Sequence, residues 1–171
     1  MKLLGLPGNN HQTGPWMETI VQSVSAASGQ ISDRRTQHYA FWQEQAGPID
    51  AEHETRLASD YKADVIIAKS MGSLLTLAAI AAHQLTPARC VFIGVPAGNG
   101  HPALSVLQRW DEFGISALFI QQTDDITGTS AQLMQLLGSN THYELAEIAG
   151  HDHVYSDTSE LISMISSWLG C

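Results

Sequence analysis

The sequence is poor in cysteine and in basic residues. Two cysteines occur in 171 residues, Cys90 within an apolar run and Cys171 at the last position, so a disulfide framework is excluded. Such scarcity is typical of a reducing compartment. Lysine and arginine number 8 against 17 aspartates and glutamates, which gives a formal net charge of −9. Because no basic cluster is present to displace the counterions of a nucleic acid, we expect no nucleic-acid partner.

Long hydrophobic runs are also missing. The longest apolar stretch, Leu74–Ala82, includes a threonine and falls well short of the about 20 residues that a membrane-spanning helix needs. The first ten residues, MKLLGLPGNN, hold one lysine and an apolar stretch too short for a signal peptide. There is no internal repeat or interdomain linker. We therefore expect a soluble, cytoplasmic protein without a membrane partner, folded as one domain over residues 1–171, and the oligomeric state stays open.

What is present is a regular alternation of short apolar runs with longer segments of helical period. Strands are expected at Lys2–Leu6, Thr36–Phe41, Val65–Ala68, Cys90–Val95, Ala117–Gln121 and His142–Ala146. Helices are expected at Gly14–Ala27, Ala51–Tyr61, Met71–His83, Pro102–Glu112, Ser130–Leu137 and Ser156–Leu169. This alternation predicts an α/β fold, doubly wound around a mostly parallel six-stranded sheet with helices on both faces.

In an open parallel sheet, ligands bind at the loops that follow the carboxyl ends of the strands. These loops hold the serine, aspartate, histidine and Gly-Asn clusters of the sequence; they are Pro7–Thr13, Lys69–Gly72, Pro96–His101, Thr123–Gly128 and Glu147–Tyr155. The segment after the fourth strand is too short to form a lid. We therefore expect an open site at this edge of the sheet.

The stretch VIIAKSMGSLL passes from a strand to a helix through Ser70. A sharp strand-to-helix turn exposes a serine hydroxyl and requires small residues two positions before and after it. Ala68 and Gly72 meet this requirement. The same hydroxyl is equally suited to cap the helix. From this stretch alone, both a nucleophile and a helix cap remain open.

A serine nucleophile needs a base, and the base needs an acid that orients it. Asp124 and Asp125 follow the strand ALFIQQ, and His151 and His153 follow the next strand. The chain order serine, acid, histidine is the one that a nucleophile on such a turn requires. The residues of these loops therefore favour the interpretation of Ser70 as a nucleophile over its interpretation as a helix cap.

With these motifs the chain resembles a small, lidless member of the α/β-hydrolase superfamily over essentially its whole length. The nearest patterns are those of dienelactone-hydrolase-like and other short bacterial serine hydrolases, in which the acid loop commonly reads Q-G-T-x-D-x-x-G and the histidine loop G-x-D-H. On QQTDDITG and GHDH, the resemblance implies Asp125 as the acid and His153 as the base. Asp124 and His151 are the second choices, and Gln122 stands where the pattern has glycine.

The resemblance also implies the strand order 2-1-3-4-5-6 without a cap domain. It implies an oxyanion hole made by the backbone amide of Met71 and an amide of Asn9 or Asn10, in a loop that lacks the usual histidine. The expected activity is hydrolysis of a small acyl substrate, of carboxylester or thioester type, through an acyl-enzyme and without a cofactor. Ala68, Gln122 and the missing histidine leave one alternative open, a catalytically silent hydrolase-like protein that serves as a binding module or scaffold.

Other signals carry less weight. GLPGNNHQTG lacks the Gly-Lys-Ser/Thr end of a phosphate-binding loop. A metal at His151–His153 would need a further ligand from His11 or His101, so no metal is predicted. Lys69 is expected to point away from the serine hydroxyl as a surface or structural lysine, and Trp16 is a candidate wall of the acyl pocket.

Overall fold

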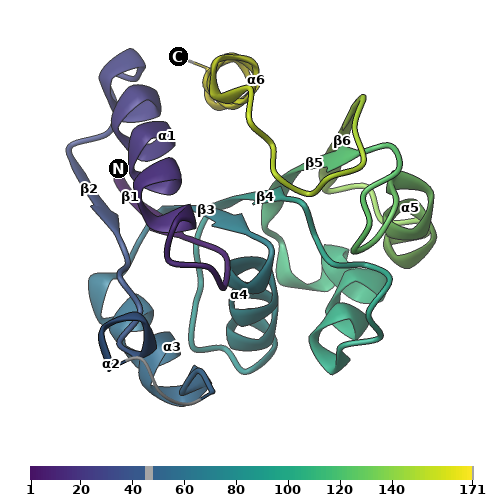
Figure 1. Cartoon of the computed structure of the whole chain (residues 1–171), viewed down its shortest axis with the longest axis horizontal. Helices are drawn as coiled ribbons and strands as arrows, with labels where there is room; N and C mark the ends of the chain where they lie inside the picture. Colours follow the sequence, from purple (N-terminus) through teal and green to yellow (C-terminus); the bar gives the residue numbers. More distant parts are fainter. Residues whose placement is uncertain (45–47, 171) are drawn as a thin grey trace.

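The protein is described here by a computed structural model that covers residues 1–44 and 48–170. Six strands form one parallel sheet in the order β2-β1-β3-β4-β5-β6 (Figure 1). The predicted strand order and direction are therefore confirmed. The strands are β1 (Lys2–Leu6), β2 (Asp33–Thr36), β3 (Val65–Lys69), β4 (Arg89–Ile93), β5 (Ser116–Gln122) and β6 (Tyr143–Ile148).

Helices cover both faces of the sheet (Figure 1). The helices are α1 (Thr13–Ala27), α2 (Phe41–Glu44), α3 (Ala51–Tyr61), α4 (Met71–Ala81), the 3₁₀ segment η1 (Pro102–Phe113), α5 (Ser130–Leu137) and α6 (Thr158–Leu169). Helices α1 and α6 pack on one face, and α3, α4, η1 and α5 pack on the other. Within the part of the chain that the structure describes, no helix has the length and apolar character needed to cross a membrane.

The central strands are apolar over most of their length because each contributes side chains to two cores. In β3, Val65 and Ile67 pack among the side chains of α1 and α6, whereas Ile66 and Ala68 pack among those of α4 and η1. All four side chains are fully buried. A strand with both faces covered shows no alternation of polar and apolar residues, as the sequence of β3 illustrates.

The predicted position of the second strand was wrong. It was expected at Thr36–Phe41 but lies at Asp33–Thr36, where it forms an edge of the sheet and is largely exposed. The apolar and aromatic run that suggested a strand leaves the sheet instead. Tyr39 is fully buried there, and its hydroxyl donates a hydrogen bond to the carbonyl of Pro7 (2.8 Å). These residues support the loop after β1, and the short helix α2 that follows them was not predicted.

Helix α4 begins very close to the carboxyl end of β1. A Cβ atom on Gly72 would overlap the carbonyl oxygen of Leu6 and lie 2.6 Å from that of Pro7. Only glycine permits this approach, which brings the start of α4 against the loop that follows β1. The small residue that the sequence placed two positions after Ser70 therefore has a steric reason.

We expect Gly72→Ala to lower the free energy of unfolding by about 1–3 kcal/mol, since β1 and α4 must separate to admit the methyl group. Urea denaturation measures the change. Gly29→Ala is the matched control, because a Cβ on Gly29 meets nothing within 4 Å. Equal stabilities of the two variants would contradict the close packing of α4 on β1.

Candidate active site

Ser70 lies on the turn between β3 and α4, with φ 52° and ψ −113°. This backbone conformation is unfavourable for a residue other than glycine. It is held in part by a hydrogen bond from the Ser70 amide to the carbonyl of Ile93 (3.1 Å). Although Ser70 occupies the cap position of α4, its side chain makes no capping hydrogen bond. The hydroxyl therefore does not serve as a helix cap.

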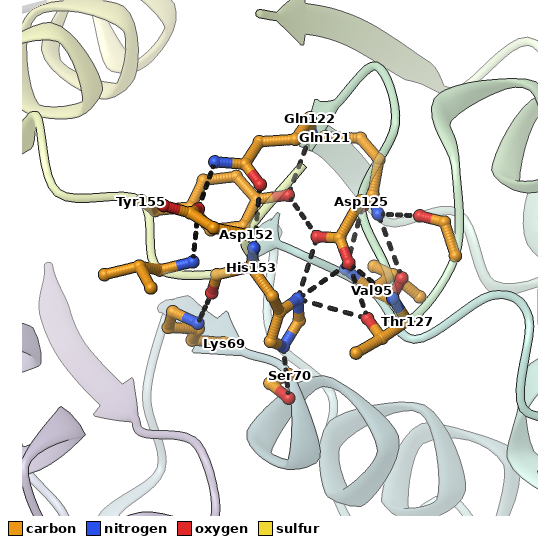
Figure 2. Close-up of polar contacts among 12 residues, drawn as sticks. Lys69, Ser70, Val95, Gln121, Gln122, Asp125, Thr127, Asp152, His153 and Tyr155 are labelled. Carbon is orange, nitrogen blue, oxygen red and sulfur yellow. Dashed lines mark hydrogen bonds and ion pairs between the residues drawn. The ribbon is translucent and has the colours of Figure 1, made fainter. Parts of the chain in front are cut away.

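His153 connects the serine to a carboxylate (Figure 2). Its Nε2 atom lies 2.8 Å from the Ser70 hydroxyl oxygen, and its Nδ1 atom lies 2.8 Å from Oδ2 of Asp125. The three residues come from the loops after β3, β5 and β6, whose carboxyl ends lie along one edge of the sheet. The structure thus brings together the serine, histidine and aspartate that the sequence singled out.

The Asp125 carboxylate is almost fully buried, with 2% of the residue exposed, and every contact that it makes suits a negative charge. Oδ1 accepts hydrogen bonds from the amide and the hydroxyl of Thr127 (2.8 Å each), and Oδ2 accepts one from the hydroxyl of Tyr155 (2.9 Å). Burial opposes ionisation, but the hydrogen bonds from His153 and Thr127 outweigh it and lower the pKa of Asp125 below its ordinary value. This carboxyl is therefore ionised beside the imidazole.

Tyr155 and Thr127 were not recognised in the sequence. Tyr155 accepts a hydrogen bond from the backbone amide of Gln122 (2.8 Å) while it donates to Asp125, so one hydroxyl joins the acid loop to the histidine loop. Burial raises the pKa of Tyr155, which keeps this donor protonated. The spacing Asp-x-Thr is a turn signal that could have pointed to Thr127. No local signal distinguishes Tyr155 from any other core aromatic residue.

Gln122, which departs from the hydrolase pattern, clamps the histidine loop. Its Oε1 accepts a hydrogen bond from the backbone amide of His153 (2.9 Å), and its Nε2 donates to the carboxylate of Asp152 (3.0 Å). The side chain fills the space beside Gly150, where a Cβ would lie 2.6 Å from the Gln122 Nε2 atom. The glutamine therefore replaces the pattern's glycine with a side chain that fixes the base.

The second choices for acid and base lie outside this arrangement. Asp124 and His151 are exposed, and neither side chain takes part in the hydrogen bonds around Ser70. His11 is exposed, and His101 accepts a hydrogen bond from the Ala103 amide at the start of η1. Within the described residues, no three histidine, cysteine or acidic side chains converge as a metal site would need.

Comparison with known proteins gives structural neighbours and no neighbours in sequence. No protein-family model matches the chain, and no curated protein matches it by sequence. The RedJ thioesterase of prodiginine biosynthesis in Streptomyces coelicolor superposes with a TM-score of 0.64 at 10% identity, over 97% of this chain and 84% of that one. A cold-adapted esterase from an Arctic intertidal metagenomic library gives 0.66 at 15% identity, with coverages of 98% and 80%. The pyrethroid hydrolase PytH gives 0.64 at 15% identity, with coverages of 99% and 97%.

The chain has the α/β-hydrolase fold. Its six parallel strands in the order 2-1-3-4-5-6, with helices on both faces, are those expected from the resemblance. At 10–15% identity the neighbours establish the fold alone, so the chemistry rests on the residues of this chain.

In this hydrolase fold, the loop after β1 faces Ser70. Asn9 accepts a hydrogen bond at its carbonyl from the indole of Trp42 (2.8 Å), and the side chain of Asn10 accepts one from the Gln12 amide (3.0 Å). Met71 is the first residue of α4, so its amide has no partner within the helix. Asn9 and Met71 line one pocket with Ser70, and Asn9 and Asn10 line a second pocket with Ser70.

Two pockets meet at Ser70 and Asn9. The first has a volume of about 680 Å³, and its walls include Met71, Leu74, Pro96, Asn99, Ile126 and Gln132. The second has a volume of about 500 Å³, and its walls include Asn10, Trp16, Lys69, Asp152, His153 and Val154. The serine thus lies between two pockets, and Trp16 lines one of them.

Lys69 was predicted as a surface or structural lysine, and its placement at the surface is wrong. It is 3% exposed, since it ends a strand that is covered on both faces. Its ammonium donates a hydrogen bond to the carbonyl of His153 (2.9 Å; Figure 2). The side chain therefore points toward the backbone of the histidine loop.

The ionised state of Asp125 predicts a specific dependence of stability on pH. A carboxyl whose pKa is lowered by folding contributes stability above its unfolded value of about 4, and this contribution is lost as the pH falls through the folded value. We expect the wild type to lose this part of its stability below about pH 4, and Asp125→Asn to lack that loss. Denaturant unfolding of both proteins between pH 7 and pH 2 measures the difference. Parallel curves throughout would contradict the hydrogen-bonded carboxylate.

Proposed function

We propose that this chain is a serine hydrolase that cleaves small acyl esters, with Ser70 as nucleophile, His153 as base and Asp125 as the orienting acid. The observation that carries the proposal is the series of hydrogen bonds from the Ser70 hydroxyl through both nitrogens of His153 to Asp125. The fold supports it, because its structural neighbours include esterases and a thioesterase. The neighbours do not identify the substrate.

The first half of the reaction forms an acyl-enzyme. His153 accepts the Ser70 proton at Nε2 while the hydroxyl oxygen attacks the carbonyl carbon of the ester. Asp125 holds the proton on Nδ1, which leaves Nε2 free to accept, and stabilises the imidazolium that results. The tetrahedral intermediate collapses when the bond to the alkoxy group breaks, and the leaving alcohol takes the proton from Nε2.

The second half releases the acid by the same route. A water molecule in the place of the alcohol gives a proton to Nε2 and attacks the acyl carbon. The bond to Ser70 breaks, its oxygen recovers the proton from His153, and the carboxylic acid leaves. We propose the amide of Met71 and an amide of the Asn9 loop as donors to the oxyanion in both halves, since Met71 and Asn9 line one pocket with Ser70. Loss of one such donor typically costs about 3–4 kcal/mol of transition-state stabilisation.

The surroundings of Ser70 favour an uncharged substrate. The rim of the first pocket carries Ile126, which is 75% exposed, and the rim of the second carries Val154, which is 55% exposed. Among the described residues that line the two pockets, Lys69 is the only lysine or arginine, and its ammonium is buried. Asp152 lines the second pocket, on a chain of net charge −9. An acyl group on a neutral ester or thioester fits this site better than one on a phosphate-bearing carrier.

The alternative is a catalytically silent hydrolase-like binding module or scaffold. Two features that suggested it have structural explanations, because Gln122 bonds to the histidine loop and Ala68 is buried in the core. A fluorophosphonate probe distinguishes the two functions. Labelling that disappears in Ser70→Ala supports the hydrolase, and a folded wild type that takes up no label supports the scaffold.

For the hydrolase, Ser70→Ala and His153→Ala should each lower kcat by about 10⁴–10⁶, because the triad acts as a unit. Asp125→Asn should cost somewhat less. Asp124→Asn and His151→Ala are the matched controls, since both side chains are exposed and outside the hydrogen-bonded series, and they should change kcat less than about threefold. Hydrolysis of p-nitrophenyl esters of graded chain length measures all five. If His151→Ala abolished turnover while His153→Ala did not, the assigned base would be wrong.

The uncharged-substrate preference is tested with two thioesters of one acyl group. We expect kcat/KM for S-butyryl-N-acetylcysteamine to exceed that for butyryl-coenzyme A by at least about 10-fold at low ionic strength, because the acidic surface repels the phosphates. The ratio of the two kcat/KM values should decrease in 0.5 M salt, where charges are screened. A lower or equal value for the neutral thioester would overturn the preference and leave the triad unaffected.

A further inference from the structure

Lys69 directly precedes the serine and lies in the wall of the second pocket, with only 3% of the residue exposed. Its Nζ atom lies 5.6 Å from the ring centre of Trp16 and 5.2 Å from that of Tyr155, so two aromatic faces surround the ammonium. Its hydrogen bond goes to the carbonyl of His153 (2.9 Å; Figure 2). Aromatic faces attract a cation most strongly when water is excluded, as it is here. The Lys69 ammonium is thus buried between two aromatic rings and bonded to the backbone of His153.

The histidine loop has a backbone that needs external support. His153 and Tyr155 have φ values of 62° and 60°, in the left-handed region that is unfavourable for side chains other than glycine. Both peptide groups of His153 are fixed by side chains from other strands, since its amide donates to Gln122 and its carbonyl accepts from Lys69. The next turn is fixed by Trp16, whose indole donates to the carbonyl of Tyr155 (3.0 Å). Without the lysine, the carbonyl of His153 loses this hydrogen bond and only the amide of His153 remains fixed by a side chain.

Two opposing effects act on the pKa of Lys69. Burial lowers the pKa of Lys69 to about 8, although the carboxylates of Asp125 and Asp152 act against it. The other groups in contact with the ammonium are the carbonyl of His153 and the ring of Tyr155 on the histidine loop, and the ring of Trp16 on α1. This pKa lies within the ordinary working range of a hydrolase.

We propose that Lys69 is a positioning residue for the base: its ammonium, held between Trp16 and Tyr155, fixes the carbonyl of His153 so that the imidazole bridges Ser70 and Asp125. This rests on the proposed function, in which His153 is the base. The lysine exchanges no proton with substrate and forms no bond to it. When it is neutral, the charge-assisted hydrogen bond and both cation–π contacts are lost, and the imidazole is no longer held in the productive geometry.

The proposal predicts opposite trends for activity and stability as the pH rises. The kcat of the wild type should fall as the pH passes about 8, because the ammonium is titrated there. The folding contribution of Lys69 should instead become more favourable between about 8 and 10.5, since the unfolded chain retains the proton that the folded chain has released. A lysine with a merely structural role would not lower kcat over a range in which its contribution to stability improves.

The experiment compares the wild type with Lys69→Met and Lys69→Arg between pH 6 and pH 10, using a p-nitrophenyl ester. We expect Lys69→Met to lower kcat by up to about 100-fold at pH 7 with KM changed less than about threefold, and to show no further fall above pH 8. Lys69→Arg keeps a permanent charge, so it should recover most of kcat and also lack the alkaline fall. Lys62→Met, at an exposed lysine before β3, is the matched control and should retain the wild-type profile.

A readout without turnover separates this proposal from the proposed function. The proton between Nδ1 of His153 and Asp125 should give a low-field ¹H NMR signal that shifts or broadens as the pH rises through about 8 in the wild type and is altered at pH 7 in Lys69→Met. If that signal responds but no ester is cleaved, Lys69 positions His153 and the proposed function fails. If esters are cleaved while Lys69→Met keeps the wild-type signal and pH profile, the role of Lys69 is overturned. If Lys69→Met does not fold, the comparison of the wild type with Lys69→Arg is sufficient. An identical fall of kcat above pH 8 in these two proteins would overturn the role of Lys69.

Discussion

The hydrogen bond between the imidazole of His153 and the hydroxyl of Ser70 is the interaction on which the rest of the site depends. It joins residues that are 83 positions apart in the chain, so no local structure produces it. It forms because β3, β5 and β6 run parallel and end at one edge of the sheet. Two of the three loops hold their residue in an unfavourable backbone conformation, since φ is positive at Ser70 and His153.

The site also has to contain a buried charge without losing stability. Asp125 is 2% exposed, and the donors around it replace the solvent: an imidazole, a threonine amide and hydroxyl, and the hydroxyl of Tyr155. Behind the base, Lys69 supplies the opposite charge in a slot lined by aromatic rings. The polar network is therefore continuous from the carboxylate to the backbone of the histidine loop, and one group in it cannot be changed without affecting the others.

The fold could be predicted from the sequence because each buried strand is apolar over most of its length and each is followed by a segment of helical period. The edge strand β2 could not, since an exposed edge needs no apolar residues and the aromatic run beside it packs on the loop after β1. Ser70, Asp125 and His153 could be selected from loop positions and chain order, and they lie together, although their catalytic roles stay predictions. Tyr155 acts only through a long-range contact that a single sequence does not contain.

The most direct test of the central claim is a crystal structure of the chain after reaction with a small fluorophosphonate. We predict a covalent bond from phosphorus to the Ser70 oxygen, a phosphoryl oxygen within hydrogen-bond distance of the Met71 amide, and His153 still bonded to Asp125. Phosphorus on another residue, or an unmodified Ser70 with the imidazole turned away from it, would contradict the account.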